Sequence, residues 1–188
     1  MTMNTLELVI FLLGSGALAF FFRKSLLNVR AHGFYRFFVF EILLFLLLIN
    51  INGWFADPLA WHQLISWFLL FASIPLAAIG WSFLRTAGKP ASRDDPALIG
   101  WEKTSKLVTV GLFRYIRHPM YSSLLCLGWG LFFKSPSWVD AGLALLGTFF
   151  LLATARIEER EDIAYFGDEY QEYMKHSYVR LTGRASVI

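Results

Sequence analysis

The segment from Gly111 to Tyr121 gathers side chains that could bind an anion. It reads GLFRYIRHPMY and places Arg117 and His118 directly before Pro119. Proline is favoured at the first position of a helix, so we expect a helix to begin there. The free N–H groups and partial positive charge of a helix N-terminus attract carboxylates and phosphates. The pattern therefore predicts an anion-binding site, unless the arginine and histidine only anchor a membrane span at the lipid headgroups.

A second segment, Ala155 to Asp162, is rich in acidic side chains and reads ARIEERED. On a helix, Glu158 shares a face with Glu161 and Asp162, because residues three and four apart are neighbours. Ionisable groups at the edge of a membrane are costly unless they are paired or hydrated. The segment is therefore either part of a polar pocket or a solvated helix end that its own ion pairs stabilise.

The composition indicates an integral membrane protein. Of the 188 residues, 56% are hydrophobic and only 16% are charged, whereas soluble domains average about 25% charged residues. A soluble chain of this size could not bury so much apolar surface. The single cysteine, Cys126, excludes a disulfide scaffold. The basic residues are spread over loops without a basic face, which argues against a nucleic-acid partner.

The apolar runs predict an all-α, polytopic membrane protein that forms a single domain, 1–188, with five transmembrane helices. The predicted spans are about 5–22, 34–52, 62–84, 119–133 and 138–155. A span needs about 20 residues, and the fourth run is marginal. It forms a helical hairpin with the fifth, while a loop, 85–118, and a tail, 156–188, are polar. The tail predicts an amphipathic helix after a bend at Gly167, lying along the membrane surface or over a site.

The distribution of positive charge predicts the orientation. All 17 lysines and arginines except Lys134 fall in segment 23–36, in the loop 85–118 or in the tail. Cytoplasmic loops are enriched in these residues, so we expect the C-terminus in the cytoplasm and the N-terminus outside, in the inner membrane of a cell. Arg36 is expected to extend toward the headgroups, and Glu41 to make a buried hydrogen bond between helices or to face a substrate cavity.

The hairpin of the fourth and fifth spans brings the basic and acidic segments to the same membrane face. His118 and Glu158 should then lie at similar depth beneath the aromatic tail. Such a site would suit a zwitterionic or cationic cofactor together with a lipid-soluble substrate.

The ordered combination of LVTVGLFRYIRHPMY, an apolar hairpin, EE and FGDEYQEY resembles the isoprenylcysteine carboxyl methyltransferase family of integral membrane enzymes. The related phospholipid N-methyltransferases share part of it. The resemblance covers about residues 105–180. It implies S-adenosyl-L-methionine as cofactor and a lipophilic or lipidated acceptor, such as a prenylated carboxylate. The sequence departs from the family at Leu112, where many members have proline.

The resemblance also implies roles for individual residues. Glu158 aligns with a glutamate that contacts the cofactor, and Arg156 and Glu159 are the candidate catalytic residues. By strict spacing, the substrate-contacting arginine of the family falls on Thr154 instead of Arg156. The other implied cofactor-binding residues are Ser105, Lys106, Leu107, Val108, Phe113, His118, Pro119, Met120 and Tyr121.

Two other functions are compatible with the sequence. Sterol reductases are membrane enzymes that also carry an RHPxY-like segment and use NADPH, although the EE pair favours methyl transfer. A non-catalytic scaffold could bind partners through the aromatic tail. The histidines His32, His62 and His176 lack the spacing of metal ligands, so no metal site is predicted. Membrane lipids are the expected surroundings, and no sequence feature indicates an oligomeric state.

Overall fold

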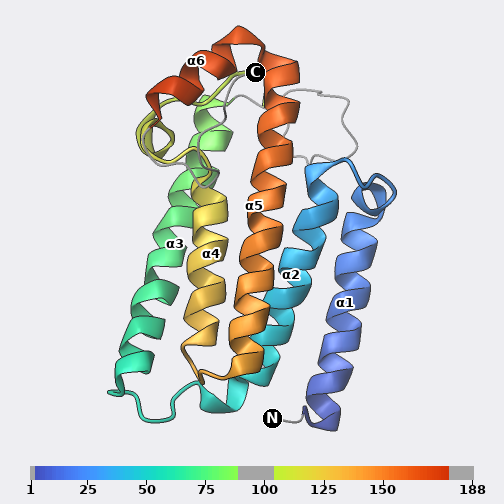
Figure 1. Ribbon diagram of the computed structural model, residues 1–188, viewed down its shortest axis with the longest axis vertical. Coiled ribbons are helices and arrows are strands. Elements are labelled where there is room, and N and C mark those ends of the chain that lie inside the picture. Colours follow the sequence, from blue (N-terminus) through green and yellow to red (C-terminus); the bar gives the residue numbers. More distant parts are fainter. Residues whose placement is uncertain (1–2, 89–103, 178–188) are drawn as a thin grey trace.

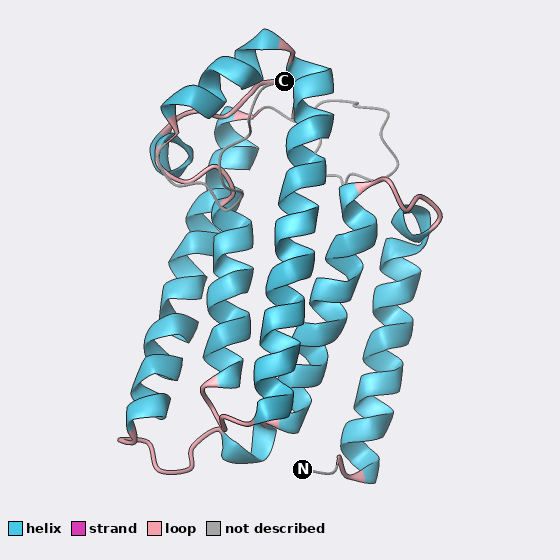
Figure 2. Cartoon of the chain, in the orientation of Figure 1, coloured by secondary structure: helices cyan, strands magenta, loops and turns pink. Residues whose placement is uncertain are grey.

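The computed structural model describes residues 3–88 and 104–177, which form a bundle of helices. The loop and the tail expected at 85–118 and 156–188 are therefore described only in part. The described helices are α1 (Thr5–Leu26), α2 (His32–Ile49), α3 (Trp61–Ala87), α4 (Pro119–Phe132), α5 (Trp138–Phe166) and α6 (Asp168–His176), with 3₁₀ turns η1 (Ile51–Gly53) and η2 (Gly111–Arg114). Figure 2 shows these helices joined by loops.

Four of the described helices, α1, α2, α3 and α5, are long and apolar enough to cross a membrane. The protein is thus an all-α polytopic membrane protein. Helix α4 has 14 residues, or about 21 Å at 1.5 Å per residue, against a hydrocarbon core of about 30 Å. It nevertheless runs beside α3 and α5 within the bundle (Figure 1).

The start of each of three helices carries a local signal. Asn4 caps α1, because its side chain accepts from the Glu7 N–H while the Glu7 carboxylate accepts from the Asn4 N–H. Ser137 caps α5. Pro119 occupies the first turn of α4, as the sequence predicts. The Asn4 and Ser137 side chains accept from N–H groups that have no partner within the helix. Proline has no N–H group, so none is left without a partner at its position.

Helices α2 and α5 pack together, α1 lies against α2, and α3 lies against α4 (Figure 1). Leu46, Leu131 and Leu151 belong to the shared apolar core. Close approach of α3 to α4 depends on Gly130, where a Cβ would lie 2.9 Å from a Leu70 methyl carbon. Small residues at such crossings allow helix backbones to come close in a membrane, where packing drives association.

The end of the bundle where α4 meets α5 contains Lys134, which is fully buried. Its ammonium group donates to the Gln63 side-chain oxygen at 3.0 Å and lies 3.4 Å from the centre of the Trp67 ring. An ammonium over a tryptophan face is stabilised by the ring quadrupole. These contacts join the turn between α4 and α5 to α3.

Helix α5 is longer than the predicted fifth span, because it continues past residue 155 to Phe166. This extension carries Glu158 and Asp162 out of the apolar run. The predicted bend at Gly167 is confirmed: this residue has φ of +62° and separates α5 from α6. Glycine adopts this backbone region without the penalty that a Cβ imposes.

Replacing Gly111 with alanine is expected to destabilise the protein by roughly 2–3 kcal/mol. A Cβ there would lie 2.1 Å from the Phe83 ring, at a residue with φ of +62°, so overpacking and backbone strain add. Gly16→Ala is the matched control, since no atom lies within 4 Å of its Cβ position and alanine favours helix. Thermal unfolding in detergent measures both, and an equal melting temperature for the two variants would contradict the expectation.

Candidate active site

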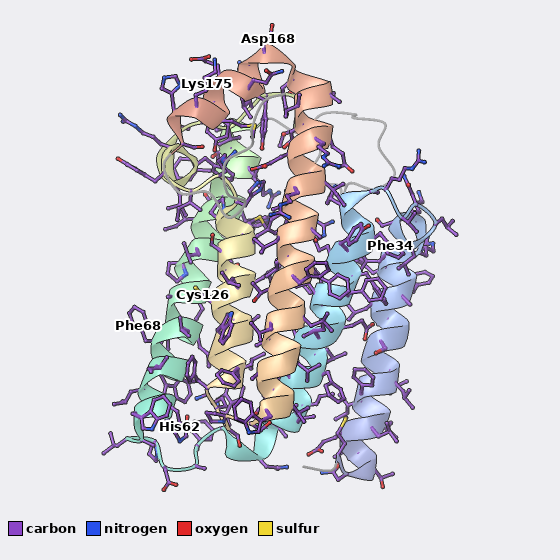
Figure 3. All side chains as sticks on the ribbon, in the orientation of Figure 1. Phe34, His62, Phe68, Cys126, Asp168 and Lys175 are labelled. Atoms are coloured by element: carbon purple, nitrogen blue, oxygen red, sulfur yellow. The ribbon has the colours of Figure 1, made fainter. Side chains whose placement is uncertain are left out.

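A cavity of about 240 Å³ lies at the end of the bundle where α4 begins. Helices α2, α3, α4 and α5, the segment before α4 and helix α6 all contribute to its wall. In Figure 3, Asp168 and Lys175 mark α6 at this end, and His62 marks the opposite end. The cavity thus lies between the helix bundle and α6.

His118 lies between two carboxylates at the start of α4. Its Nδ1 atom is 3.3 Å from Glu158 Oε2, and its Nε2 atom is 3.3 Å from Glu159 Oε1. The same Glu159 oxygen is 3.0 Å from Nη1 of Arg117. Arg117, His118 and Glu159 are each less than 9% exposed. The basic and acidic segments of the sequence therefore meet in one buried ionic cluster.

The two carboxylates determine the charge of His118. Burial by itself would lower the pKa of His118, but the hydrogen bonds to Glu158 and Glu159 outweigh this effect and raise the pKa from 6.5 to about 9. The imidazole is therefore cationic at neutral pH and donates to both carboxylates. Hydrogen bonds between ionised partners are about twice as strong as those between neutral groups.

Aromatic side chains form the other part of the site. The rings of His118 and Tyr121 stack, with centroids 5.3 Å apart and an interplanar angle of 17°. Tyr170 and Tyr173 of α6 line the cavity, and the Tyr173 hydroxyl donates to the Phe113 carbonyl at 2.7 Å. Burial raises the pKa of both tyrosines. They remain neutral, and the hydrogen bond holds α6 over η2.

Helix α2 contributes a cation that the sequence did not place in the site. Arg36 is 3% exposed and lines the cavity, so the expectation that it extends toward the headgroups is wrong. Its position follows from the start of α2, where the Glu161 carboxylate accepts from the His32 N–H at 3.1 Å and contacts the His32 ring. Arg36 lies one helical turn later. Glu41 is instead hydrogen-bonded by Ser15 of α1 at 2.6 Å, which confirms an interhelical bond.

Most of the predicted cofactor-binding residues line the cavity. These are Leu107, Val108, Phe113, His118, Pro119, Met120, Tyr121 and Glu158. Ser105 and Lys106 do not line it; both are exposed, and their backbone N–H groups donate to the Gly88 carbonyl. Their predicted contact with a cofactor therefore lacks support from this geometry.

The two candidate catalytic residues lie elsewhere. Arg156 is exposed and is not part of the cavity wall. Glu159 is also outside the wall, and its carboxylate faces Arg117 and His118. Thr154, the alternative to Arg156, is buried and donates to the Phe150 carbonyl. Because α5 turns about 100° per residue, neighbouring positions face different surroundings, and only Glu158 of these four lines the cavity.

Several cavity residues were not predicted as site residues: Arg36, Phe40, Asp162, Tyr170 and Tyr173. Three signals in the sequence could have found some of them. Asp162 shares a helix face with Glu158, and the tyrosines belong to the predicted amphipathic helix. Arg36 had a third signal, because an ionisable residue inside an apolar run often marks a functional site. Within residues 3–88 and 104–177, no group of three or more His, Cys, Asp or Glu could hold a metal ion.

The segment that builds this cluster resembles known methyltransferases. Residues 96–169 match the phospholipid methyltransferase family. The match includes η2, α4 and α5, and therefore both His118 and Glu158. Methyltransferases of this family use S-adenosylmethionine as methyl donor.

The chain is also similar to Methanethiol S-methyltransferase 1 of Bradyrhizobium diazoefficiens, with 32% identity over 94 residues. The aligned part is 48% of this chain and 31% of that relative, so the chain spans about a third of the relative's length. No solved structure matches the chain. Both matches are to methyltransferases, which agrees with the enzyme class that the sequence motifs predict.

Proposed function

We propose that the protein transfers the methyl group of S-adenosylmethionine to a lipophilic acceptor, and that the cavity beneath α6 is its active site. One observation carries this proposal. The cationic His118 and the carboxylate of Glu158 lie 3.3 Å apart in the cavity wall, within the segment that matches a methyltransferase family.

The residues of the cavity fit the chemical groups of this donor. The donor has an ammonium group, a carboxylate, a ribose and an adenine. Glu158 and Asp162 would bind the ammonium or ribose, while Arg117, His118 and the N-terminus of α4 would bind the carboxylate. The aromatic faces of Tyr121 and Phe113 suit adenine or a sulfonium cation.

When bound, the donor supplies an electrophilic methyl carbon: the acceptor's lone pair forms the new bond to it as the carbon–sulfur bond breaks and leaves its electrons on sulfur. The protein's contribution is to position both partners, which can supply about 7–11 kcal/mol. His118 keeps its proton at neutral pH and so holds Glu158 in place. Tyr170 and Tyr173 cover the site and restrict the entry of water.

The surroundings of the cavity favour a lipophilic acceptor. Phe40 of α2, Ala77 of α3 and Leu124 of α4 add an apolar wall next to the charged cluster. These helices belong to a bundle whose outer surface is rich in exposed apolar side chains such as Phe68 and Phe71. An isoprenylcysteine-like carboxylate or a lipid, as the sequence resemblance implies, would fit this combination. We further propose that α4 is a fifth, short span, which puts the site at the cytoplasmic face, in keeping with the excess of positive charge there.

Ligand binding to the purified protein tests this function. S-adenosylhomocysteine should raise the melting temperature in detergent, because a ligand that binds only the folded state stabilises it, by about 2.7 kcal/mol at 100 times its Kd. Sterol-reductase-like activity predicts stabilisation by NADPH instead. Absence of stabilisation by either ligand in a cooperatively unfolding preparation would contradict the methyltransferase proposal and support a scaffold.

A further inference from the structure

Helix α2 begins without a capping side chain of its own. Ala31 occupies the N-cap position, and the first turn carries no acidic residue. The first N–H groups of a helix need acceptors from elsewhere, and a carboxylate is favoured there. Glu161 of α5 supplies both of its oxygens: Oε1 accepts from the His32 N–H at 3.1 Å, and Oε2 lies 2.5 Å from Nδ1 of the His32 ring. A side chain 129 residues away therefore caps α2.

His32 can influence the site only through its neighbours. It is fully buried and does not line the cavity, so it cannot contact a bound donor. Its Nε2 atom has no hydrogen-bond partner within residues 3–88 and 104–177. The polar contact that the structure describes for this ring is the one to Glu161. Any effect of His32 on donor binding must therefore pass through Glu161 or through its charge.

The part of α5 that Glu161 belongs to has little apolar packing. Of residues 156–166, only Glu159 is buried. Side-chain packing across interfaces normally sets the rotation of a helix about its axis, so polar contacts must do most of this here. Glu161 lies three residues after Glu158 and on the same helix face. Holding Glu161 against α2 therefore also sets the direction of Glu158, which a rotation of about 100°, one residue position, would turn out of the cavity wall.

The same contact brings positive charge near Glu158. Burial by itself would raise the pKa of Glu158, but its hydrogen bond to His118 outweighs this effect and lowers the pKa. The positive charges of His32 and Arg36 lower it further. Arg36 lies one helical turn after His32 and lines the cavity. The contact between α2 and α5 thus joins two residues of the cavity wall, Arg36 and Glu158.

We infer that His32 and Glu161 are positioning residues, whose contact fixes the rotation of the end of α5 and so holds Glu158 in the donor-binding site. This inference rests on the proposed methyltransferase function and adds two residues to it. His32 lies outside the segment that matches the methyltransferase family, residues 96–169, whereas Glu161 lies within it. Helix α2 thereby contributes to donor binding as well as to the membrane-embedded bundle.

Binding of S-adenosylhomocysteine to the full chain in lipid nanodiscs tests the inference, with Kd measured by titration calorimetry. His32→Ala removes the ring and should weaken binding about 10-fold, the range expected for a lost hydrogen bond to a charged group. His32→Asn should retain most of the affinity, because its amide N–H can donate to Glu161 from near the position of Nδ1. This recovery separates positioning by a hydrogen bond from a loss of packing.

The opposite end of the same two helices provides a matched control. There the Asn50 side chain, at the end of α2, donates to Asp140 of α5 at 3.2 Å. Asn50→Ala removes this buried contact between α2 and α5, so it should lower the melting temperature as His32→Ala does. It should leave the Kd unchanged, because Asp140 and Glu158 are 18 residues apart, or about 27 Å along the helix.

The pKa of His118 gives a second measurement that needs no ligand. Burial lowers this pKa, but Glu158 and Glu159 outweigh the effect and raise it to about 9. A rotation of α5 that withdraws these carboxylates should lower it toward 6.5, whereas loss of a neighbouring cation would by itself raise it. NMR titration of protein with isotope-labelled histidines should therefore show a lower pKa of His118 in His32→Ala and an unchanged one in Asn50→Ala.

Each outcome decides the inference. Unchanged affinity, or an unchanged or raised pKa of His118, in folded His32→Ala would overturn it, as would absence of recovery in His32→Asn or an equal loss of affinity in Asn50→Ala. If His32→Ala does not fold, His32→Phe, which keeps a ring but lacks its N–H, takes its place in both measurements. Failure of the unaltered protein to bind S-adenosylhomocysteine would contradict the proposed function itself, and the NMR comparison would still decide whether His32 positions Glu158.

Discussion

Replacing Glu158 with glutamine is expected to weaken S-adenosylhomocysteine binding by at least about 30-fold, since truncating one partner of a buried, hydrogen-bonded charge pair costs about 2–5 kcal/mol. The Glu158 carboxylate lines the cavity and lies 3.3 Å from His118. A neutral amide attracts neither the donor's ammonium group nor the imidazolium. Titration calorimetry of the detergent-solubilised variant measures the change in Kd.

Two matched variants make this result specific. Glu172→Gln removes an exposed carboxylate of α6 and should leave the Kd unchanged. Glu159→Gln removes the neighbouring carboxylate, which faces Arg117 and His118 but does not line the cavity. It should lower the melting temperature clearly, because Arg117 and His118 lose a buried partner. The Kd of the folded variant for S-adenosylhomocysteine should change much less than in Glu158→Gln. Affinity equal to that of the unaltered protein in folded Glu158→Gln would contradict the assignment of Glu158 to the donor site.

The melting temperature is expected to fall as the pH rises from about 6.5 through about 9, because the folded state loses the charge of His118. The folded-state pKa of about 9 exceeds the ordinary value of 6.5, so the protonated form stabilises the folded state. This contribution is fully present below pH 6.5 and is lost as the pH rises through about 9. The shift corresponds to roughly 3 kcal/mol. Thermal unfolding across this pH range measures it.

His118→Gln identifies the group responsible. Glutamine does not titrate, so the pH dependence between 6.5 and 9 should flatten, and the variant should be less stable at pH 6.5 because Glu158 and Glu159 lose their shared cation. Loss of one partner from a buried ion pair typically costs about 3–5 kcal/mol. The exposed His176 of α6 provides the control His176→Gln, which should keep the pH dependence. A slope that persists in His118→Gln would show that another group causes it.

The helices were predictable from the sequence because a bilayer offers no hydrogen bonds to the backbone, so an apolar run long enough to span it must be helical. The apolar runs therefore located α1, α2, α3 and α5 within a few residues at most ends. The exception is the C-terminal end of α5, which extends to Phe166 because a helix can continue into water where its charged side chains are solvated. The sequence indicated the role of α4 less clearly than that of the other helices. Its 14 residues are fewer than a full span needs, and its apolar sequence is not typical of a soluble loop.

The sequence by itself also determined that the segment around His118 and the segment around Glu158 lie at one end of the bundle. A hairpin of two adjacent helices leaves no other arrangement, because its two open ends must be neighbours. Local order likewise indicated Pro119 as a helix start and Gly167 as a bend, since each residue restricts or frees its own backbone.

Only the tertiary structure decided which charges meet. The rotation of α5 about its axis placed Glu158 in the cavity wall, Glu159 against Arg117, and Arg156 on the exposed surface. The contact between His32 and Glu161, 129 residues apart, brought Arg36 into the site. Such choices depend on the packing of helices distant in sequence, whose relative rotation is set by side-chain fit across their interfaces and not by the local pattern of either helix.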